Sequence, residues 1–280
     1  MTVRFGFKTS QWGVDWPTLL ATWELADSLP SLDSGWLFDH FSGIADRAPT
    51  PDGSHEGWTV ASAVATRTRR LRFGHLVLGN THRHPALLAR MAATIDHVAG
   101  PDRFILGLGT GWLASEHEMF GWSLPPLSDR MTMLESSVQV IKGMWAAPTG
   151  FSFEGAPYAL RHARCEPAPL TAGGPPIWLG TQGLRRGLRI VARHADGWNA
   201  NGDFASYLEK RDALLRHCDE VGRDPAAIEI SAQLLDDRSN AELVEEANRL
   251  GHANRVELPY YGNPTSRLLA PPWYPTYKLA

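Results

Sequence analysis

One stretch of the chain contains a complete β-α-β unit, and this unit constrains the fold more than any other feature. Residues 71–79 are almost all apolar, as in a strand covered by helices. Pro85 then begins a helical pattern, with apolar residues at three- and four-residue steps as far as Gly100. A second apolar stretch, residues 104–108, follows directly. Two strands joined through one helix predict a parallel sheet.

Both strands of this unit end in turns that expose the backbone. Residues 79–81 read Gly-Asn-Thr, and residues 107–111 read Gly-Leu-Gly-Thr-Gly. Parallel neighbours end at the same edge of a sheet, so both turns lie at one edge. We therefore expect a ligand site there.

The alternation of strands and helices continues on both sides of the unit. The strand candidates are residues 3–9, 35–38, 71–79, 104–108, 176–180, 197–199, 228–235 and 256–261. Seven helical patterns alternate with these eight strands, which predicts an α/β fold, a (β/α)8 TIM barrel, as one domain over residues 1–280. The alternative is an open doubly wound sheet, but the first strand lacks the glycine-rich phosphate turn that such a sheet places there.

Some segments do not fit the simple repeat. Long polar or irregular segments follow strands 2 and 4, including a predicted hairpin within residues 151–170. Residues 263–280 are rich in proline and aromatics without periodicity, so the closing helix is expected to be short, irregular or absent.

Composition excludes several classes of function. The net charge is −3, so the electrostatic footprint of a nucleic-acid binder is missing. No apolar run is long enough for a membrane span, and the first residues lack the apolar core of a signal peptide. Cys165 and Cys218 match no disulfide framework or zinc spacing, which suits a reducing cytoplasm.

The strand ends offer little for metal or hydrolytic chemistry. His82 and His84 with His40 form a conceivable three-histidine site, but histidines in a loop are more often solvated, and no metal is predicted. No serine lies in a nucleophile elbow. The glycine turns suit a flat cofactor better, and a helix start after residues 180–183 suits a phosphate, although the same glycines can simply make tight turns. Asp39 next to His40 can orient the imidazole for proton transfer, although a histidine bonded to backbone is the alternative.

A series of segments in this order resembles the luciferase-like flavin and deazaflavin oxidoreductases, and most of all the branch that uses coenzyme F420. The matching segments are residues 34–41, 76–81, 84–86, 104–112, 130–145, 153–155, 175–180 and 192–199. The resemblance implies a barrel whose mouth holds the cofactor ring. It also implies a bulge in the third strand, often with a non-proline cis peptide, within residues 76–79.

The resemblance transfers roles to individual residues. His40 and Asp39 are the expected catalytic pair, with His40 handling the proton. Expected cofactor contacts are Leu78, Gly79, Asn80, Thr81, Thr110, Gly111, Ser115, Gly180, Thr181, Gln182, Gly183 and Leu184. Expected substrate contacts are Gln11, Trp12, Trp112 and Trp198.

Two departures from the family pattern narrow the substrate. Members that oxidise a sugar phosphate carry a glutamate after the Gly-x-Gly turn and a tryptophan four residues after the histidine, where this chain has Trp112 and Ile44. Indole cannot donate a proton as a carboxylic acid does, so a small, fairly apolar substrate is expected. The expected function is hydride transfer with coenzyme F420 in a cytoplasmic homodimer. The alternatives are an FMN-dependent monooxygenase using O2 and a non-catalytic flavin- or deazaflavin-binding barrel.

Overall fold

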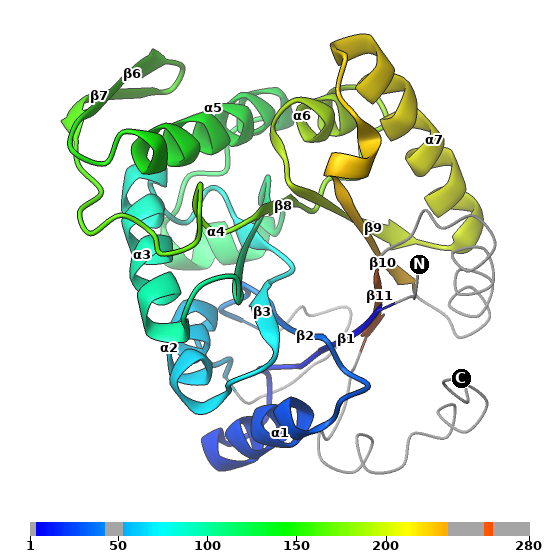
Figure 1. Cartoon of the computed structure of the whole chain (residues 1–280). Helices are drawn as coiled ribbons and strands as arrows, with labels where there is room; N and C mark the ends of the chain where they lie inside the picture. Colours follow the sequence, from blue (N-terminus) through cyan, green and yellow to red (C-terminus); the bar gives the residue numbers. More distant parts are fainter. Residues whose placement is uncertain (1–3, 43–52, 235–254, 260–280) are drawn as a thin grey trace.

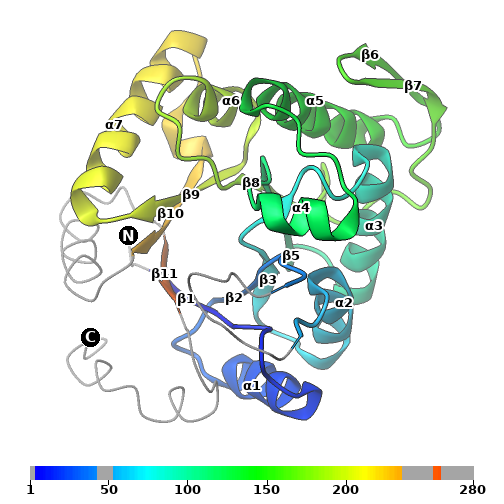
Figure 2. The same cartoon turned by 180° about the vertical axis from the view of Figure 1, so that it is seen from behind.

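A curled sheet of parallel strands forms the centre of the molecule, with helices around it (Figure 1; Figure 2). The computed structural model describes residues 4–42, 53–234 and 255–259. Within them the strands of the sheet are β1 (Arg4–Lys8), β2 (Ser34–Leu37), β3 (Arg72–His75), β4 (Leu78–Gly79), β5 (Phe104–Gly109), β8 (Ile177–Leu179), β9 (Gly197–Gly202), β10 (Glu229–Leu234) and β11 (Arg255–Pro259). Their order is β3-β2-β1-β11-β10-β9-β8-β5-β4, and β3 also pairs with β5.

Helices surround this sheet. They are α1 (Trp16–Ser28), α2 (Gly57–Arg67), α3 (Pro85–Ala99), α4 (Ala114–Phe120), α5 (Leu127–Ala146), α6 (Arg186–His194) and α7 (Phe204–Val221). A short 3-10 helix, η1 (Pro225–Ala227), precedes β10. Side-chain caps set where two of the helices begin: Asp15 accepts a hydrogen bond from Thr18 N at 2.8 Å, and Glu56 accepts from Thr59 N at 2.7 Å.

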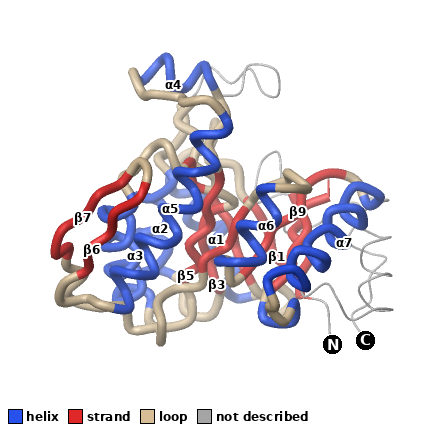
Figure 3. The backbone as a smooth tube through the Cα atoms, turned by 90° about the horizontal axis from the view of Figure 1, so that it is seen from above, coloured by secondary structure: helices blue, strands red, loops and turns tan. Residues whose placement is uncertain are grey.

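The chain leaves this alternation between β5 and β8. Helix α4 follows β5 almost at once, and Figure 3 shows it standing beyond one end of the sheet. After α5 an antiparallel hairpin, β6 (Phe151–Gly155) and β7 (Tyr158–Ala163), lies inside the stretch for which the sequence predicts one. Of these insertions, α4 brings Glu116 and His117 to the turns that follow β2 and β4, whereas the hairpin packs along α5.

The predicted third strand is divided into two pieces. β3 ends at His75 and β4 begins at Leu78, and the peptide bond between Leu76 and Val77 is cis. This confirms the non-proline cis peptide expected within residues 76–79. β4 pairs with β5 through Leu78 and Leu108, so the chain rejoins the sheet at once.

Two apolar layers lie on opposite faces of the sheet. The larger one joins strands to helices and includes the fully buried Trp23, Phe73 and Trp198. The smaller one lies inside the curled sheet and consists of Trp36, Leu76, Ile105 and Trp178, with Val77 packed against it. The rings of Trp36 and Trp178 are 5.0 Å apart, so indoles from β2 and β8 meet across the interior.

The α/β class and the parallel sheet predicted from sequence are confirmed. The predicted helix over residues 241–250 and the irregular tail over residues 263–280 lie outside the described residues. The complete eightfold barrel and its single-domain extent therefore stay predictions. In the part that is described, no helix combines the length and hydrophobicity needed to cross a membrane.

Candidate active site

The ends of four neighbouring strands bring the predicted site residues to one rim. β2 pairs with β3, β3 and β4 pair with β5, and β5 pairs with β8, all in parallel. The turns that follow them carry Asp39 and His40, Asn80 and Thr81, Thr110 and Gly111, and Gly180 and Thr181. Because parallel strands finish at the same edge, these turns lie side by side at the end of the sheet.

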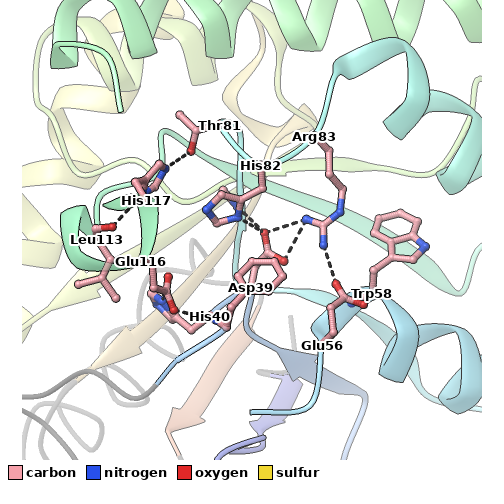
Figure 4. A network of polar contacts seen from close by, with 12 residues as sticks. Asp39, His40, Glu56, Trp58, Thr81, His82, Arg83, Leu113, Glu116 and His117 are labelled. Atoms are coloured by element: carbon pink, nitrogen blue, oxygen red, sulfur yellow. Dashed lines mark hydrogen bonds and ion pairs between the residues drawn. The ribbon is translucent and has the colours of Figure 1, made fainter. Parts of the chain in front are cut away.

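Asp39 is the centre of a buried polar network at this rim (Figure 4). Its Oδ2 accepts hydrogen bonds from Gly79 N at 2.9 Å and from Arg83 Nη1 at 2.9 Å. His82 Nδ1 lies 2.8 Å from the same oxygen. The carboxylate therefore ties the end of β2 to β4 and to the turn after it.

The charge of Asp39 is balanced within the network. Burial alone would raise the pKa of Asp39, but the hydrogen bond from His82 and the positive charge of Arg83 outweigh it and lower the pKa. Arg83 also reaches Glu56 Oε1 at 2.6 Å, and Glu56 caps α2. Asp39 is thus an ionised carboxylate committed to holding the rim together, not a partner of the adjacent His40.

Glu116, on α4, is the carboxylate that contacts His40. Its Oε2 lies 3.1 Å from His40 Nδ1, and its Oε1 accepts from Phe41 N at 2.7 Å and Ser42 N at 2.9 Å. Burial would raise the pKa of Glu116, but the hydrogen bonds from His40 and from Ser42 N lower it. An ionised carboxylate can only accept, so His40 Nδ1 carries a proton. No described residue hydrogen-bonds Nε2, the other ring nitrogen.

Aromatic side chains surround the His40 ring. The centroids of Trp12 and Phe38 lie 5.8 Å from that of His40, and the Trp112 ring meets it edge-on at 5.6 Å. The Trp112 side chain is 54% exposed, although its ring is apolar. His40 therefore has one charged partner and otherwise apolar walls.

A second imidazole is fixed beside this pair. His117 Nδ1 donates to Leu113 O at 2.8 Å, so His117 Nε2 accepts from the hydroxyl of Thr81 at 2.7 Å. The ring of His82 packs against that of His117 at 5.2 Å. The Thr81 hydroxyl is therefore oriented by α4.

The glycines of this rim make room for protein atoms. A Cβ on Gly107 would collide with the carbonyl oxygen of His75, so β5 and β3 approach closely there. A Cβ on Gly109 would lie 2.5 Å from Val77 Cγ2, and one on Gly180 would lie 2.8 Å from Val77 Cγ1. Val77, which is partly exposed, thus occupies the space that both glycines leave. Val77 is thus the side chain that the divided third strand presents at the rim of the sheet.

Some side chains in and beside the turn before α6 are already hydrogen-bonded within the protein. Gln182 Oε1 accepts from Asn201 N at 3.0 Å and from Lys210 Nζ at 3.0 Å, and its Nε2 donates to Asn199 O. Arg186, at the start of α6, donates to Ser128 O on α5. No side chain caps α6, and Leu188 N of its first turn donates to Gly183 O at 3.0 Å, so the N–H groups of Arg186 and Gly187 are the ones that a ligand could use.

Two buried polar atoms in the turn after β4 lack a partner in the described part of the chain. They are Nδ2 of Asn80 and Nε2 of His82. Burying an unpaired polar group costs free energy, so such atoms are sites where a ligand can supply the missing hydrogen bond. Asn80 Nδ2 is a donor and fits an acceptor of a planar ring, such as a carbonyl oxygen or a ring nitrogen. His82 directs its Nδ1 proton to Asp39, so its Nε2 offers an acceptor instead.

Several predicted contacts are not where the sequence interpretation put them. Trp198 is fully buried and stacks on Tyr207 of α7 in the helix-facing layer, so it cannot line a pocket. Leu78 faces the same layer, because side chains on a strand alternate and Val77 takes the inner position. The side-chain amide of Gln11 already has partners on both sides: its Oε1 accepts from Phe38 N at 2.8 Å, and its Nε2 donates to His55 O at 2.9 Å.

Other predicted residues keep open positions. Ser115, Gly183 and Leu184 are exposed beside the rim. The imidazoles of the conceivable three-histidine site have other partners, with His82 on Asp39 and His84 accepting from Ala86 N at 3.2 Å. Ile44 lies outside the described residues.

Sequence reasoning missed the roles of Glu116, Arg83 and Val77. The sequence places Glu116 in a short helix after the Gly-Leu-Gly-Thr-Gly turn, so a carboxylate about one helical turn into α4 could have signalled a partner for His40. Arg83 follows β4 by four residues, which is the only local hint that it lies near Asp39.

Comparison with known proteins agrees with this architecture. The family model described as luciferase-like monooxygenase matches residues 6–265. A phthiodiolone/phenolphthiodiolone dimycocerosates ketoreductase of Mycobacterium kansasii is 30% identical over 231 residues, covering 74% of this chain and 60% of that protein. An F420-dependent glucose-6-phosphate dehydrogenase of Amycolatopsis mediterranei (strain U-32) is 32% identical over 187 residues, 62% of this chain and 53% of that protein. The chain therefore spans somewhat over half the length of these relatives.

Solved structures share the fold. An F420-dependent secondary alcohol dehydrogenase in complex with an F420–acetone adduct superposes with a TM-score of 0.77 at 17% identity, covering 92% of this chain and 93% of that one. The monooxygenase RslO1 from Streptomyces bottropensis superposes with a TM-score of 0.67 at 20% identity, covering 88% and 77%. The family match extends over most of the chain, and the resemblance drawn from sequence is confirmed: this chain belongs to the luciferase-like monooxygenase family.

Proposed function

We propose that this protein is an oxidoreductase that transfers a hydride between coenzyme F420, a deazaflavin, and a small, fairly apolar organic substrate. The observation that carries the proposal is His40, which stands at the rim with Nδ1 bonded to Glu116 and no described partner for Nε2. When bound, coenzyme F420 would supply or accept the hydride. His40 Nε2 would give a proton to the substrate oxygen during reduction or take it during oxidation.

The rim also offers residues that would hold the cofactor. Val77 would back the ring, and Asn80 Nδ2 would donate to one of its acceptors, which satisfies a buried polar atom. The uncapped start of α6, beyond Thr181, would take the anionic side chain. These are the roles that the family resemblance assigns to the turns after β4 and β8.

The aromatic walls favour an apolar substrate. Trp12 and Trp112 flank His40 and offer indole faces, not carboxylates. Trp112 stands where family members that oxidise a sugar phosphate carry a glutamate, and among the described residues the only carboxylate on His40 is the buried Glu116. We therefore favour a ketone, a secondary alcohol or another neutral substrate over a sugar phosphate.

Cofactor choice is the direct test. The purified protein, freed of any bound cofactor, would be titrated with coenzyme F420 and separately with FMN, and binding followed by the absorbance and fluorescence of each. We expect coenzyme F420 to bind in the micromolar range or tighter, and Asn80→Leu to weaken binding roughly fivefold to tenfold, since one hydrogen bond contributes about 1 kcal/mol.

Other outcomes would replace the proposal. Binding of FMN with O2 consumption in the reduced state would identify a monooxygenase. Binding of neither cofactor in the micromolar range would reject a flavin or deazaflavin enzyme. The eightfold barrel, the homodimer and the cytoplasmic location remain part of the proposal, and buried, unpaired Cys165 and Cys218 are compatible with a reducing compartment.

A further inference from the structure

We infer that Glu116 is the positioning residue for His40, and that it fixes the imidazole proton on Nδ1 so that Nε2 alone faces the mouth. The sequence interpretation had given this task to Asp39. The tautomer is a property of the protein without any cofactor. The use of Nε2 for proton transfer rests on the proposed function.

The contacts of Glu116 define the geometry. One oxygen, Oε2, meets His40 Nδ1 at 3.1 Å, while the other, Oε1, accepts from Phe41 N, Ser42 N and, at 3.3 Å, Ser42 Oγ. Glu116 is 1% exposed, so these hydrogen bonds form away from water. The same carboxylate thus holds both the ring and the backbone that follows it.

This arrangement makes the two oxygens unequal. Oε1 faces only donors, so a glutamine at this position would keep its oxygen there and turn its NH2 toward His40. An NH2 donates, so Nδ1 would have to accept and the proton would move to Nε2. A single change of charge at Glu116 is therefore expected to invert the tautomer of a residue 76 positions away.

No other described charged group competes for the His40 ring. From its own loop, Asp39 is committed to His82 and Arg83. From the β1 exit comes Trp12, from the β2 exit Phe38, and from the β5 exit Trp112, none of which titrates as an acid or base near neutral pH. Glu116 on α4 is thus the one described charged side chain in contact with the His40 ring.

The proposed step balances in either direction. In the reduction of a carbonyl, the hydride and its electron pair, which coenzyme F420 would supply when bound, would pass to the carbonyl carbon. The carbonyl oxygen takes the proton from Nε2 of protonated His40, which becomes neutral and keeps its Nδ1 proton. Oxidation of an alcohol reverses both transfers. Glu116 remains ionised throughout and stabilises the protonated ring.

The tautomer can be observed directly by nitrogen NMR of the imidazoles in protein labelled with 15N-histidine and free of cofactor. The chain has 11 histidines, and the His40 signals would be assigned by their loss in His40→Gln. For the neutral ring, we expect the Nδ1–H form in the native protein and the Nε2–H form in Glu116→Gln. Glu118→Gln, an exposed neighbour on α4, is the control and should match the native protein.

An Nε2–H form in the native protein would overturn the inference, and this result does not depend on any variant folding. An unchanged His40 spectrum in folded Glu116→Gln would overturn it as well. Because these spectra need no cofactor, they can succeed or fail independently of the proposed function.

Kinetics provide the second readout. We expect Glu116→Gln to lower kcat by roughly 10- to 100-fold, part of the 10² to 10⁴ that a positioned general acid contributes, with KM nearly unchanged. Glu116→Asp, which keeps the charge, should restore part of the rate. Equal kcat in Glu116→Gln and Glu118→Gln would contradict the assignment.

Discussion

The carboxylate of Asp39 accepts a hydrogen bond from the backbone N–H of Gly79 at 2.9 Å, which joins the end of β2 to β4 across the divided third strand. The neighbouring residue, His40, points instead to Glu116. Two adjacent residues at one strand end therefore have separate tasks. Asp39 stabilises the rim, and His40 is available for chemistry.

Replacing Asp39 by Asn should destabilise the protein by about 3 kcal/mol, because it breaks a buried ion pair with Arg83. This loss of stability lies at the low end of the range that is usual for breaking a buried ion pair, since Arg83 keeps Glu56 as a partner. Denaturant unfolding monitored by tryptophan fluorescence measures the loss. Glu166→Gln, at an exposed pair 3.7 Å from Arg164, is the control and should change stability by less than about 0.5 kcal/mol. Equal stability of the two variants would contradict a structural role for Asp39.

The stability of the native protein should decline in acid. The pKa values of Asp39 and Glu116 are lowered in the folded state from ordinary values of 3.8 and 4.5, so the unfolded chain binds protons first as the pH falls. Their contribution is present above these ordinary values and is lost as the pH falls below about 5 and through the folded pKa values. Unfolding free energies measured from pH 6 to 3 should show this slope, and Asp39→Asn should make it shallower. A slope identical to that of the native protein would exclude Asp39 as a source.

His75 should add a second, less acidic pH dependence. Its ring is fully buried and stacks on Trp58 at 5.6 Å, and burial is the main cause that lowers its pKa from 6.5. The unfolded chain therefore binds a proton here first, and stability falls as the pH drops below about 6.5. His75→Phe keeps an aromatic ring on Trp58 and should remove this part of the slope between pH 7 and 5. The exposed His97→Gln should leave it intact, and persistence of the slope in His75→Phe would place its origin elsewhere.

His40→Ala should bind coenzyme F420 as the native protein does but lose turnover by roughly 10² to 10⁴, the usual contribution of a general acid or base. Binding follows from cofactor fluorescence, and turnover from the absorbance change of the coenzyme with a ketone or alcohol substrate. Turnover equal to that of the native protein would remove His40 from the mechanism.

Two glycines of β5 should respond differently to alanine. Gly109→Ala meets Val77 Cγ2 and should cost about 1 to 3 kcal/mol of stability. Val77→Ala removes that atom, so the double variant should recover most of the loss. In Gly107→Ala the new methyl group meets the backbone carbonyl of His75, which no side-chain substitution can remove. Val77→Ala should therefore not restore the stability of Gly107→Ala. Denaturant midpoints of the native protein, the three single variants and the two double variants test this, and failure of the Gly109 rescue would mean that Val77 does not fill that space.

Local patterns in the sequence were enough to predict much of the architecture. Helical periodicity and apolar runs predicted the parallel strands and the helices between them, because burial of one face imposes a repeat on each element. The polar exits after β2, β4, β5 and β8 follow from the same patterns, since parallel strands must end at one edge.

Only the tertiary structure decided which side chains at that edge meet. Glu116 contacts His40 across 76 residues of sequence, and Arg83 contacts Asp39 across 44. The repeat of apolar residues within a helix or strand cannot predict a contact between residues so far apart in the sequence. The division between β3 and β4 also turned Val77 inward and Leu78 outward, which no alternation read from an unbroken strand could show. The apolar repeat of a helix or strand depends only on residues close to one another in the sequence. The partner of a buried charge depends on how the elements pack, because a buried charge needs a compensating group from whatever element lies beside it.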